Sequence, residues 1–439
     1  MNFESLNLDK SILKSLAKKG YKEPTPIQEQ TIPHVLAGRD VVGCAQTGTG
    51  KTAAFALPTI HRILELLGKP TTGAEKRRQR SGRRIIRCLI LSPTRELAGQ
   101  IGENIDTYSE FTNLRSTVVY GGVKQYSQVK ALKHGVDILV ATPGRLIDLG
   151  QQGYIDLTKI DVLILDEADQ MLDMGFIPDL TLIVSKCNED RQTLMFSATM
   201  APEIRRLSKK WLNNPEEIQV SPEASTPDLV EQSLFFVDRQ DKQQVLTELL
   251  RGIEGEKTLV FTRTKRGADK VTKRLSNDGI KAIAIHGDKS QAQRRAAMQR
   301  FKSNRPPVLI ATDLASRGLD FSDISHVINF ELPQTPEVYV HRIGRTARAG
   351  RAGVAISFCA GDERKQLRLI ERLMRESLPV KPISVISEAL VGVVKELPAE
   401  DTSTPRSKQR GSHPGRRRWH AKNGSGKSKP SGGNRRRSK

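Results

Sequence analysis

Short apolar runs alternate with amphipathic stretches along most of this chain. The runs are rich in Val, Ile and Leu and are apolar at nearly every position, whereas in the stretches between them apolar residues recur every three or four positions. This alternation predicts strands separated by helices. Because a strand that is apolar on both faces is buried on both, we expect parallel sheets covered by helices on each side. The first series of predicted strands lies at residues 40–44, 87–91, 117–120, 137–141, 162–165 and 193–196.

The alternation stops at residues 213–228, which contain Pro215, Pro222 and Pro227 and few apolar residues. We interpret this segment as a linker between domains. A second series of predicted strands follows at residues 234–237, 258–261, 283–285, 308–311, 326–329 and 354–358, and a last helix is predicted at residues 362–376. The pattern therefore predicts two tandem α/β domains of similar size.

The N-terminal region has a different pattern. A helix is predicted at residues 6–19, ending before Gly20. The sequence GYKEPTPIQ follows at residues 20–28, and its prolines favour an extended segment that presents the Gln28 amide. An amide that both donates and accepts suits the edge of a purine base. Taken alone, a surface turn with an incidental Gln is the preferred alternative.

The charge of the chain is strongly positive and unevenly placed. The net charge is +22, and residues 402–439 contain thirteen Lys or Arg and no Asp or Glu. This tail is too polar to form a core, so we predict that it is disordered. Its charge favours a nucleic-acid partner. A second basic segment at residues 68–84 is interpreted as a solvated loop, with RNA contact as the minor alternative.

The remaining composition excludes several classes of protein. No apolar run is long enough to span a membrane, and residues 1–10 lack a signal-peptide pattern, so we expect a cytoplasmic protein without a membrane partner. The four cysteines are far apart and lack metal-ligand spacing. We expect them to be structural thiols.

The sequence AQTGTGKT at residues 45–52 lies between a predicted strand and a predicted helix at residues 53–67, which is the context of a phosphate-binding loop. Gly48 and Gly50 would let the backbone approach an anion, Lys51 would reach the β- and γ-phosphates, and Thr52 would reach Mg²⁺. Ala45 stands where the general pattern has its first glycine. An ordinary Gly-rich turn is the alternative.

A pair of acids follows another predicted strand. In the sequence DEAD at residues 166–169, Asp166 is a candidate Mg²⁺ ligand and Glu167 could activate a water molecule. Charges at a helix N-terminus are the alternative. The polar sequences PTRELA, TPGR and SAT, at residues 93–98, 142–145 and 197–199, also follow predicted strands, so all should meet at one edge of the sheet.

The second domain contains HRIGRTARAG at residues 341–350. Arg342, Arg345 and Arg348 would share one face of a helix and could act as arginine fingers on a nucleotide held by the first domain. A basic, solvated helix face is the alternative. Because the phosphate-binding loop and the arginine fingers lie on separate domains, hydrolysis would require closure of the cleft between them.

The order of these motifs resembles that of the DEAD-box ATP-dependent RNA helicases, and the bacterial RhlE-type subgroup most closely, over about residues 3–378. The resemblance implies two tandem RecA-like domains, each a mostly parallel sheet with helices on both faces. We expect the domains at residues 1–218 and 231–385, a linker at 219–230 and a disordered basic tail at 386–439.

The resemblance also implies a role for each motif. Catalysis would involve Lys51, Asp166, Glu167, Arg345 and Arg348, with Thr52 and Asp166 holding Mg²⁺, partly through water. The nucleotide would be bound by Phe3, Tyr21, Gln28, Ala45, Gln46, Thr47, Gly48, Thr49, Gly50, Lys51, Thr52 and Asp320. Contacts of Ser197 and Thr199 with Asp169 would couple nucleotide state to closure, together with His341 and Arg342. RNA would be contacted by Arg95, Gly122, Thr142, Arg145, Arg263, Gln291, Arg294 and Thr312.

The implied activity is RNA-dependent hydrolysis of ATP, with Mg²⁺, that locally unwinds short RNA duplexes or remodels RNA–protein complexes. RNA would be bound largely without regard to sequence, by a monomer that could serve ribosomal or RNA-decay complexes. An ATP-gated RNA clamp without productive unwinding is the alternative. A DNA helicase is weaker, because helicases of that kind usually lack GYKEPTPIQ.

Overall fold

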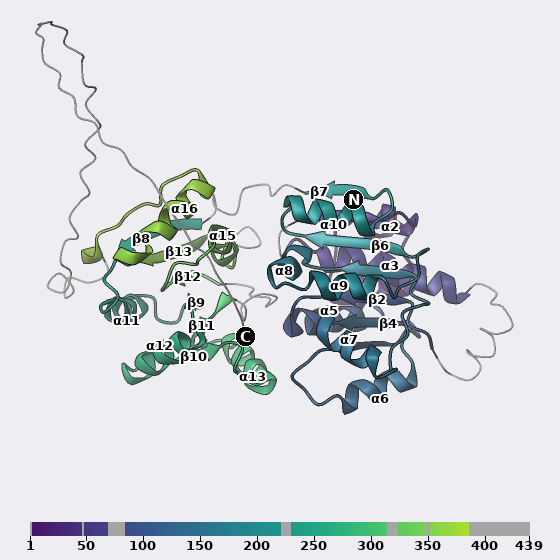
Figure 1. The fold of residues 1–439 in the computed structure, drawn as a ribbon, viewed down its shortest axis with the longest axis horizontal. Helices are drawn as coiled ribbons and strands as arrows, with labels where there is room; N and C mark the ends of the chain where they lie inside the picture. Colours follow the sequence, from purple (N-terminus) through teal and green to yellow (C-terminus); the bar gives the residue numbers. More distant parts are fainter. Residues whose placement is uncertain are drawn as a thin grey trace, which may run out of the picture. The chain divides into compact units, whose positions relative to one another are not determined.

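A computed structural model describes residues 2–45, 48–68, 84–220, 230–313, 324–347 and 352–385. These residues form two parallel sheets flanked by helices (Figure 1), so the predicted fold class is confirmed. The strand order of the first sheet is β3-β4-β2-β5-β6-β1-β7, and that of the second is β10-β11-β9-β12-β13-β8.

The strands are short, and consecutive strands are joined mostly through helices. In the first sheet the strands are β1 (Val41–Cys44), β2 (Cys88–Leu91), β3 (Ser116–Val119), β4 (Ile138–Ala141), β5 (Val162–Leu165), β6 (Gln192–Ser197) and β7 (Glu216–Gln219). Its helices are α1 (Lys10–Lys19), α2 (Pro26–Leu36), α3 (Lys51–Gly68), α5 (Arg95–Tyr108), α6 (Tyr126–His134), α7 (Pro143–Gln151), α8 (Ala168–Asp173), α9 (Ile177–Val184) and α10 (Pro202–Trp211), after a 3₁₀ turn, η1 (Phe3–Leu6).

The second sheet contains β8 (Val230–Phe236), β9 (Thr258–Phe261), β10 (Ala282–Ile285), β11 (Val308–Ala311), β12 (His326–Asn329) and β13 (Gly353–Cys359). Its helices are α11 (Lys242–Gly252), α12 (Lys265–Asn277), α13 (Gln291–Phe301), α15 (Pro336–Ile343) and α16 (Arg364–Met374), with 3₁₀ turns η3 (Gly361–Glu363) and η4 (Ile383–Val385).

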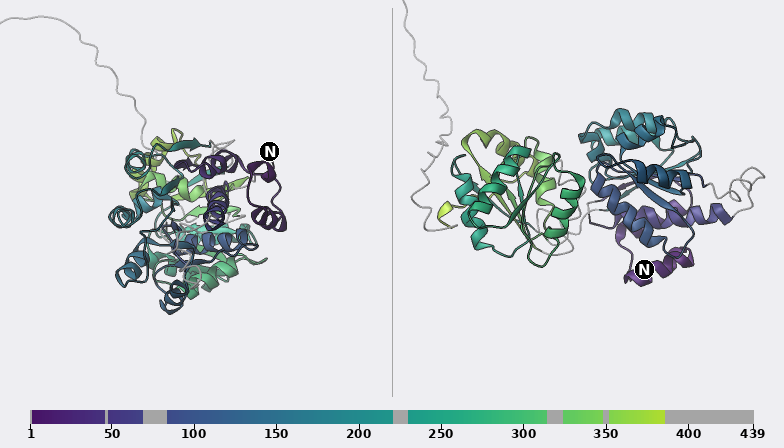
Figure 2. Two further views of the ribbon diagram at one scale, coloured as in Figure 1. Left: turned by 90° about the vertical axis from the view of Figure 1, so that its right-hand side faces the viewer. Right: turned by 90° about the horizontal axis from the view of Figure 1, so that it is seen from below.

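Alternate residues of each strand point into different cores, which explains the continuous apolar runs. In β2, Cys88 and Ile90 belong to the core beneath α1, α2, α3 and α5, whereas Leu89 and Leu91 belong to the core beneath α7 to α10. All four are fully buried. The second sheet is covered on both faces in the same way, as the right-hand view of Figure 2 also shows. A strand with two buried faces is apolar at most positions.

The strand order determines which loops meet at the carboxyl edge of the first sheet. Strands β5, β6 and β1 are neighbours, so the loops that follow them lie side by side. These loops carry the DEAD, SAT and AQTGTGKT sequences. Strands β3, β4 and β2 are also neighbours, and they bring together Gly122, TPGR and PTRELA. One edge of the sheet therefore contains two adjacent groups of polar residues.

Three elements differ from the sequence predictions. Residues 213–228 were interpreted as linker, but Glu216–Gln219 form β7, which pairs with β1 at the edge of the first sheet. The prediction of an extended segment up to Gln28 was also wrong, because α2 begins at Pro26 and Gln28 is its third residue. The predicted helix at residues 6–19 is interrupted at Asn7, which has a positive φ, and α1 begins only after Asp9 caps it.

The structure also tests two expectations that came from the composition, on the cysteines and on membrane spans. All four cysteines are free thiols, and Cys88, Cys187 and Cys359 are buried. Among the described residues, we find no helix that is both long and apolar enough to cross a membrane.

Candidate functional site

The phosphate-binding loop passes from β1 into α3, with Gln46 and Thr47 outside the described residues. Gly50 has a φ of 94°, and a Cβ there would lie 2.3 Å from Nε2 of Gln28. Only glycine fits both restrictions. Lys51 begins α3, is buried, and its Nζ donates a hydrogen bond of 2.6 Å to the carbonyl oxygen of Ala45. The lysine ammonium is therefore held across the loop.

Gln28 lies against this loop. Its Oε1 accepts from the backbone N–H of Thr25 at 3.0 Å, and its Nε2 donates to the carbonyl oxygen of Gly50 at 3.1 Å. The amide has a second N–H and a second acceptor site beyond these two bonds. Position and orientation of Gln28 thus depend on its place in the first turn of α2, rather than on a rigid extended loop.

Of the two aromatic residues expected near the base, only Tyr21 lines the cavity above the loop. Tyr21 is 42% exposed, whereas Phe3 is 4% exposed and stacks behind it, with ring centroids 6.3 Å apart. The Tyr21 hydroxyl lies 3.4 Å from that of Tyr108 at the end of α5. Burial and this hydrogen bond raise the pKa of Tyr108.

We call this space the nucleotide cavity. Its volume is about 560 Å³, which suits a small-molecule ligand. The predicted residues that line it are Tyr21, Gln28, Gly48, Gly50, Lys51, Thr52, Asp166 and Glu167.

The two acids stand at the end of β5. The backbone N–H of Asp166 donates to the carbonyl oxygen of Leu91 at 3.0 Å, which extends the ladder between β5 and β2. Glu167 has a φ of 53°, a conformation that costs a non-glycine residue free energy and that is often found at functional sites. Both carboxylates are buried. The fold therefore holds two acids, without exposure to bulk water, beside the phosphate-binding loop.

The residues present fit a magnesium ion. Burial raises the pKa of Asp166, and the charge of Lys51 opposes this only in part, so a divalent cation would stabilise the ionised carboxylate. Asp166 and the Thr52 side chain line the same cavity and offer the oxygen ligands that Mg²⁺ prefers. Within the described ranges there is no cluster of three His, Cys, Asp or Glu residues that could hold a metal ion alone. Phosphate oxygens and water would have to complete the coordination, which is usual for Mg²⁺.

Asp169 connects DEAD with SAT. Its Oδ2 accepts from the backbone N–H groups of Ala198 and Thr199, both at 3.0 Å, and from the Thr199 hydroxyl at 3.3 Å. The expected contact from the Thr199 hydroxyl to Asp169 is therefore present. The Ser197 hydroxyl, which was also expected to contact Asp169, instead donates to the carbonyl oxygen of Thr199 at 2.7 Å.

The prediction that Arg342, Arg345 and Arg348 share one helix face was wrong, because α15 ends at Ile343 and Arg345 lies in the following turn. Arg342 points into its own domain, where it binds Asp313 with Nε at 2.5 Å and Nη2 at 2.9 Å, and also contacts Asn329. Arg345 is buried, and its Nε donates to the carbonyl oxygen of His341 at 3.2 Å. Arg348 and Asp320 lie outside the described residues.

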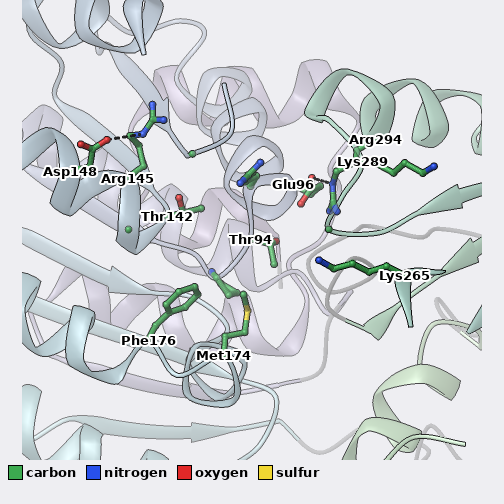
Figure 3. A pocket seen from close by; sticks show the side chains of 15 residues that line it. Thr94, Glu96, Thr142, Arg145, Asp148, Met174, Phe176, Lys265, Lys289 and Arg294 are labelled. Carbon is green, nitrogen blue, oxygen red and sulfur yellow. Dashed lines mark hydrogen bonds and ion pairs between the residues drawn. The ribbon is translucent and has the colours of Figure 1, made fainter. Parts of the chain in front are cut away.

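A second cavity, which we call the basic pocket, lies beyond β4 and β2 (Figure 3). Four of the predicted RNA contacts line it: Arg95, Thr142, Arg145 and Arg294. Gly122 has a φ of 75°, and a Cβ there would lie 1.8 Å from Nη1 of Arg95, so a glycine lets this guanidinium lie against the backbone. Arg145 pairs through Nε with Asp148 at 3.3 Å and donates through Nη2 to the carbonyl oxygen of Val123 at 3.4 Å.

Residues of the second domain complete the basic pocket. Oε1 of Glu96 accepts from Nε2 of Gln291 at 3.1 Å and from Nε of Arg294 at 2.7 Å. The Arg263 guanidinium binds the buried Glu363 at 2.8 Å, and Arg263 does not line the pocket. Thr312, which directly follows β11, is buried and is not a lining residue either.

Sequence reasoning missed several lining residues. They are Glu96, Met174, Phe176, Lys265 and Lys289 in the basic pocket, and Gln100, Glu103, Asn104 and Tyr108 in the nucleotide cavity. Lys265 is paired with Asp288 at 2.6 Å and Lys289 with Asp269 at 2.8 Å. Of these residues, only Glu96 lies in a motif that the sequence analysis quoted, PTRELA.

The first domain carries a phosphate-binding loop and a basic pocket at one edge of its sheet, and the second domain carries arginines at the end of α15 and in the turn that follows. This arrangement defines a nucleotide-dependent enzyme of the two-domain helicase class. Residues 25–207 match the DEAD/DEAH box helicase family, and residues 241–350 match the helicase conserved C-terminal domain. The chain belongs to the DEAD-box helicase family.

Individual relatives agree with this assignment. The ATP-dependent RNA helicase CshA of Limosilactobacillus reuteri is 44% identical over 395 residues, which cover 90% of this chain and 76% of that protein. A protein of the same name from Listeria monocytogenes is 42% identical over 393 residues, covering 90% and 72%. These names do not support the expected RhlE-type subgroup. Among solved structures, S. cerevisiae Dbp5 bound to RNA and ADP BeF3 has a TM-score of 0.73 and 29% identity, covering 89% of this chain and 99% of that one.

Proposed function

We propose that this protein hydrolyses ATP when RNA is bound and uses the cycle to separate short RNA duplexes locally. The observation that carries the proposal is the placement of a nucleotide cavity and a basic pocket on one edge of one sheet. The names of the CshA relatives and the RNA and ADP BeF3 bound to Dbp5 support the same substrates.

ATP would enter the nucleotide cavity with its adenine on the exposed face of Tyr21. The spare donor and acceptor of Gln28 would read the adenine edge, and its bond to Gly50 would link that recognition to the phosphates. Lys51 would exchange the carbonyl oxygen of Ala45 for phosphate oxygens. Thr52 and Asp166 would hold Mg²⁺, which when bound neutralises phosphate charge.

Glu167 would orient and deprotonate the attacking water, because it is the buried acid next to the Mg²⁺ ligand. Arg345 and Arg348 would stabilise the charge that develops on the transferred phosphoryl group. Asp169, bonded to both N–H groups of Ala198 and Thr199, would transmit the nucleotide state to the SAT loop. Arg342 and His341 would position the arginines from α15.

RNA would lie across the basic pocket. Nη1 of Arg145 is buried and has no hydrogen-bond partner within the part of the chain that the structure describes, which suits a phosphate oxygen. Arg95, Gly122 and Thr142 would add further contacts to the backbone. The second domain would contribute Gln291, Arg294, Thr312 and Arg263. Such contacts position a strand without reading its sequence.

The proposal includes domains at residues 1–218 and 231–385. It also includes a monomeric protein that acts in ribosomal or RNA-decay complexes. We also propose a cytoplasmic location, which the four free cysteines suit because reducing compartments keep thiols unpaired.

The first experiment measures ATP turnover by the full chain with single-stranded RNA, with matched DNA and without nucleic acid. We expect strong stimulation by RNA only. In Glu167→Gln, stimulated turnover should fall by about 10²–10⁴-fold, because the general base is removed, while ATP still binds.

Different results would contradict different parts of the proposal. Equal stimulation by DNA would exclude RNA specificity. Unchanged turnover in Glu167→Gln would exclude its role as base. RNA-stimulated turnover without release of a short duplex by the purified protein would favour the ATP-gated clamp.

A further inference from the structure

Tyr126 is the most exposed large apolar side chain among the described residues, at 77%. It is the first residue of α6, four positions after Gly122. Tyr120 and Tyr108, by contrast, are both buried. A tyrosine ring that contacts this little of its own protein contributes little to the stability of the fold.

A chain of polar contacts connects the residue beside this ring to the basic pocket. Arg145 and Asp148 line the pocket, and Oδ1 of Asp148 accepts from Nε2 of Gln152 at 2.8 Å. Gln152 and Gln125 exchange two amide hydrogen bonds, of 3.1 and 3.3 Å. Gln125 directly precedes Tyr126. Through these bonds the end of α7 fixes the start of α6, where Tyr126 is the first residue, relative to a residue that lines the pocket.

The surroundings of Tyr126 are polar and basic. Lys124, Gln125 and Ser127 are exposed, and Lys130 is exposed one helical turn further on the same face. No other large apolar side chain among the strongly exposed ones of the described chain belongs to α6 or α7. A surface for another folded protein normally presents a contiguous apolar patch, whereas a single ring between amides and lysines suits one nucleobase and its phosphates.

We propose that Tyr126 stacks on a base of the bound RNA and extends the RNA site on the first domain beyond the basic pocket. Lys124 and Lys130, which are exposed two positions before and four positions after Tyr126, would contact the phosphates of the stacked nucleotide. Stacking of this kind accepts any base, because each has a π-face. This inference rests on the proposed function, since it assumes that RNA occupies the basic pocket.

The test measures the affinity of the full chain for fluorescently labelled oligouridylates, lengthened one nucleotide at a time, with ADP and beryllium fluoride present. We expect Tyr126→Ala to weaken binding by at least about fivefold once the RNA is long enough to reach the ring. Shorter RNAs should bind both proteins equally. Tyr126→Phe and Tyr126→Trp should retain the wild-type affinity, because both keep a stacking face.

A second arm uses RNAs with a single abasic position moved along the strand. In the wild type, one position outside the shortest binding RNA should weaken binding, and this effect should vanish in Tyr126→Ala. Phe111→Ala serves as the matched control, since Phe111 is also an exposed aromatic residue, at 37%. Phe111 follows the end of α5, and the Lys14 ammonium lies over its ring. The affinity of this variant for RNA should not change.

The outcomes separate this inference from the proposed function. A wild type that binds no oligouridylate would overturn both. Wild-type binding together with unchanged affinity in Tyr126→Ala at every length would overturn the stacking proposal alone, and would assign the ring to a protein partner. An abasic effect that persists in the variant would also overturn it.

Discussion

At the scale of the residue, the two described arginines of HRIGRTARAG are both buried but differ in their hydrogen-bond partners. Arg342 is 2% exposed and its donors are directed at Asp313, Asn329 and the carbonyl oxygen of Glu331. Its guanidinium carbon also lies 4.9 Å from the ring centre of Phe261. Arg345 is in the turn after α15 and has a bond to the last turn of that helix. Arg342 therefore has several partners inside its own domain, whereas Arg345, which is also buried, directs its Nε at the preceding helix.

We predict that Arg342 contributes mainly to stability and Arg345 mainly to catalysis. Arg342→Gln should lower the free energy of unfolding by about 3 kcal/mol, the lower end for breaking a buried ion pair, because Asp313 is partly exposed. Arg345→Gln should cost about 1 kcal/mol for the lost bond to the carbonyl oxygen of His341, but should reduce RNA-stimulated kcat by about 10³-fold or more. Denaturant unfolding and steady-state turnover measure the two effects. The reverse pattern would show that the roles are exchanged.

At the scale of the element, β7 shows how an edge strand is held. The Asp40 carboxylate lies just before β1 and accepts from the backbone N–H of Thr193 at 2.7 Å and from that of Asn213 at 2.7 Å. Its own carbonyl oxygen accepts from the N–H of Glu216 at 2.8 Å. One residue thus connects the starts of β1, β6 and β7. Burial raises the pKa of Asp40, although both N–H bonds oppose this.

We therefore predict that Asp40→Ala loosens β7. Each N–H left without an acceptor should cost about 1–3 kcal/mol, whereas Asp40→Asn keeps one acceptor oxygen and should cost less. Hydrogen exchange at residues 216–219 should become faster in Asp40→Ala, and denaturant unfolding should report the lower stability. Unchanged exchange at these amides would show that pairing with β1 alone holds the strand.

The same elements show what the sequence could predict. Strands such as β2 and β5 were predictable because both of their faces are buried, which leaves a continuous apolar run. Strand β7 was not, because in EEIQ only Ile218 is buried, and an edge strand next to prolines has the composition of a loop. Helix α2 was missed because Pro26 favours an extended segment as much as the first turn of a helix.

The candidate site was predictable in its motifs but not in its contacts. Phosphate-binding glycines and paired acids have fixed local spacing, so Gly50, Asp166 and Glu167 could be found directly. The partners of Glu96 and Arg263 come from residues far along the chain, Arg294 and Glu363 among them. Such pairs depend on tertiary packing, which no local pattern contains.

At the scale of the whole molecule, most of the net positive charge lies outside the two domains that carry the motifs. Residues 402–439 contain thirteen Lys or Arg and no acid. A segment of this kind binds RNA through its phosphates, without sequence preference, by releasing counterions. It would raise the local concentration of RNA near the basic pocket.

Truncation after Glu400 should therefore raise the apparent KM for RNA and leave kcat unchanged. The slope of log affinity against log salt should become shallower, by about 0.7 for each phosphate that the tail neutralises. Turnover at several RNA and salt concentrations measures both quantities. A large fall in kcat would show that the tail takes part in catalysis.

The backbone bond from Asp166 to Leu91 has a mechanical consequence for the first domain. It lies where the three strands behind the nucleotide cavity join the three behind the basic pocket, and it continues the β2–β5 ladder to the start of DEAD. Sliding of one half of the sheet along the other would have to break this ladder. On the proposed function, ATP and RNA would occupy the two halves of one stiff sheet, so strain between the two sites would have to be released by bending of loops or by movement of the other domain.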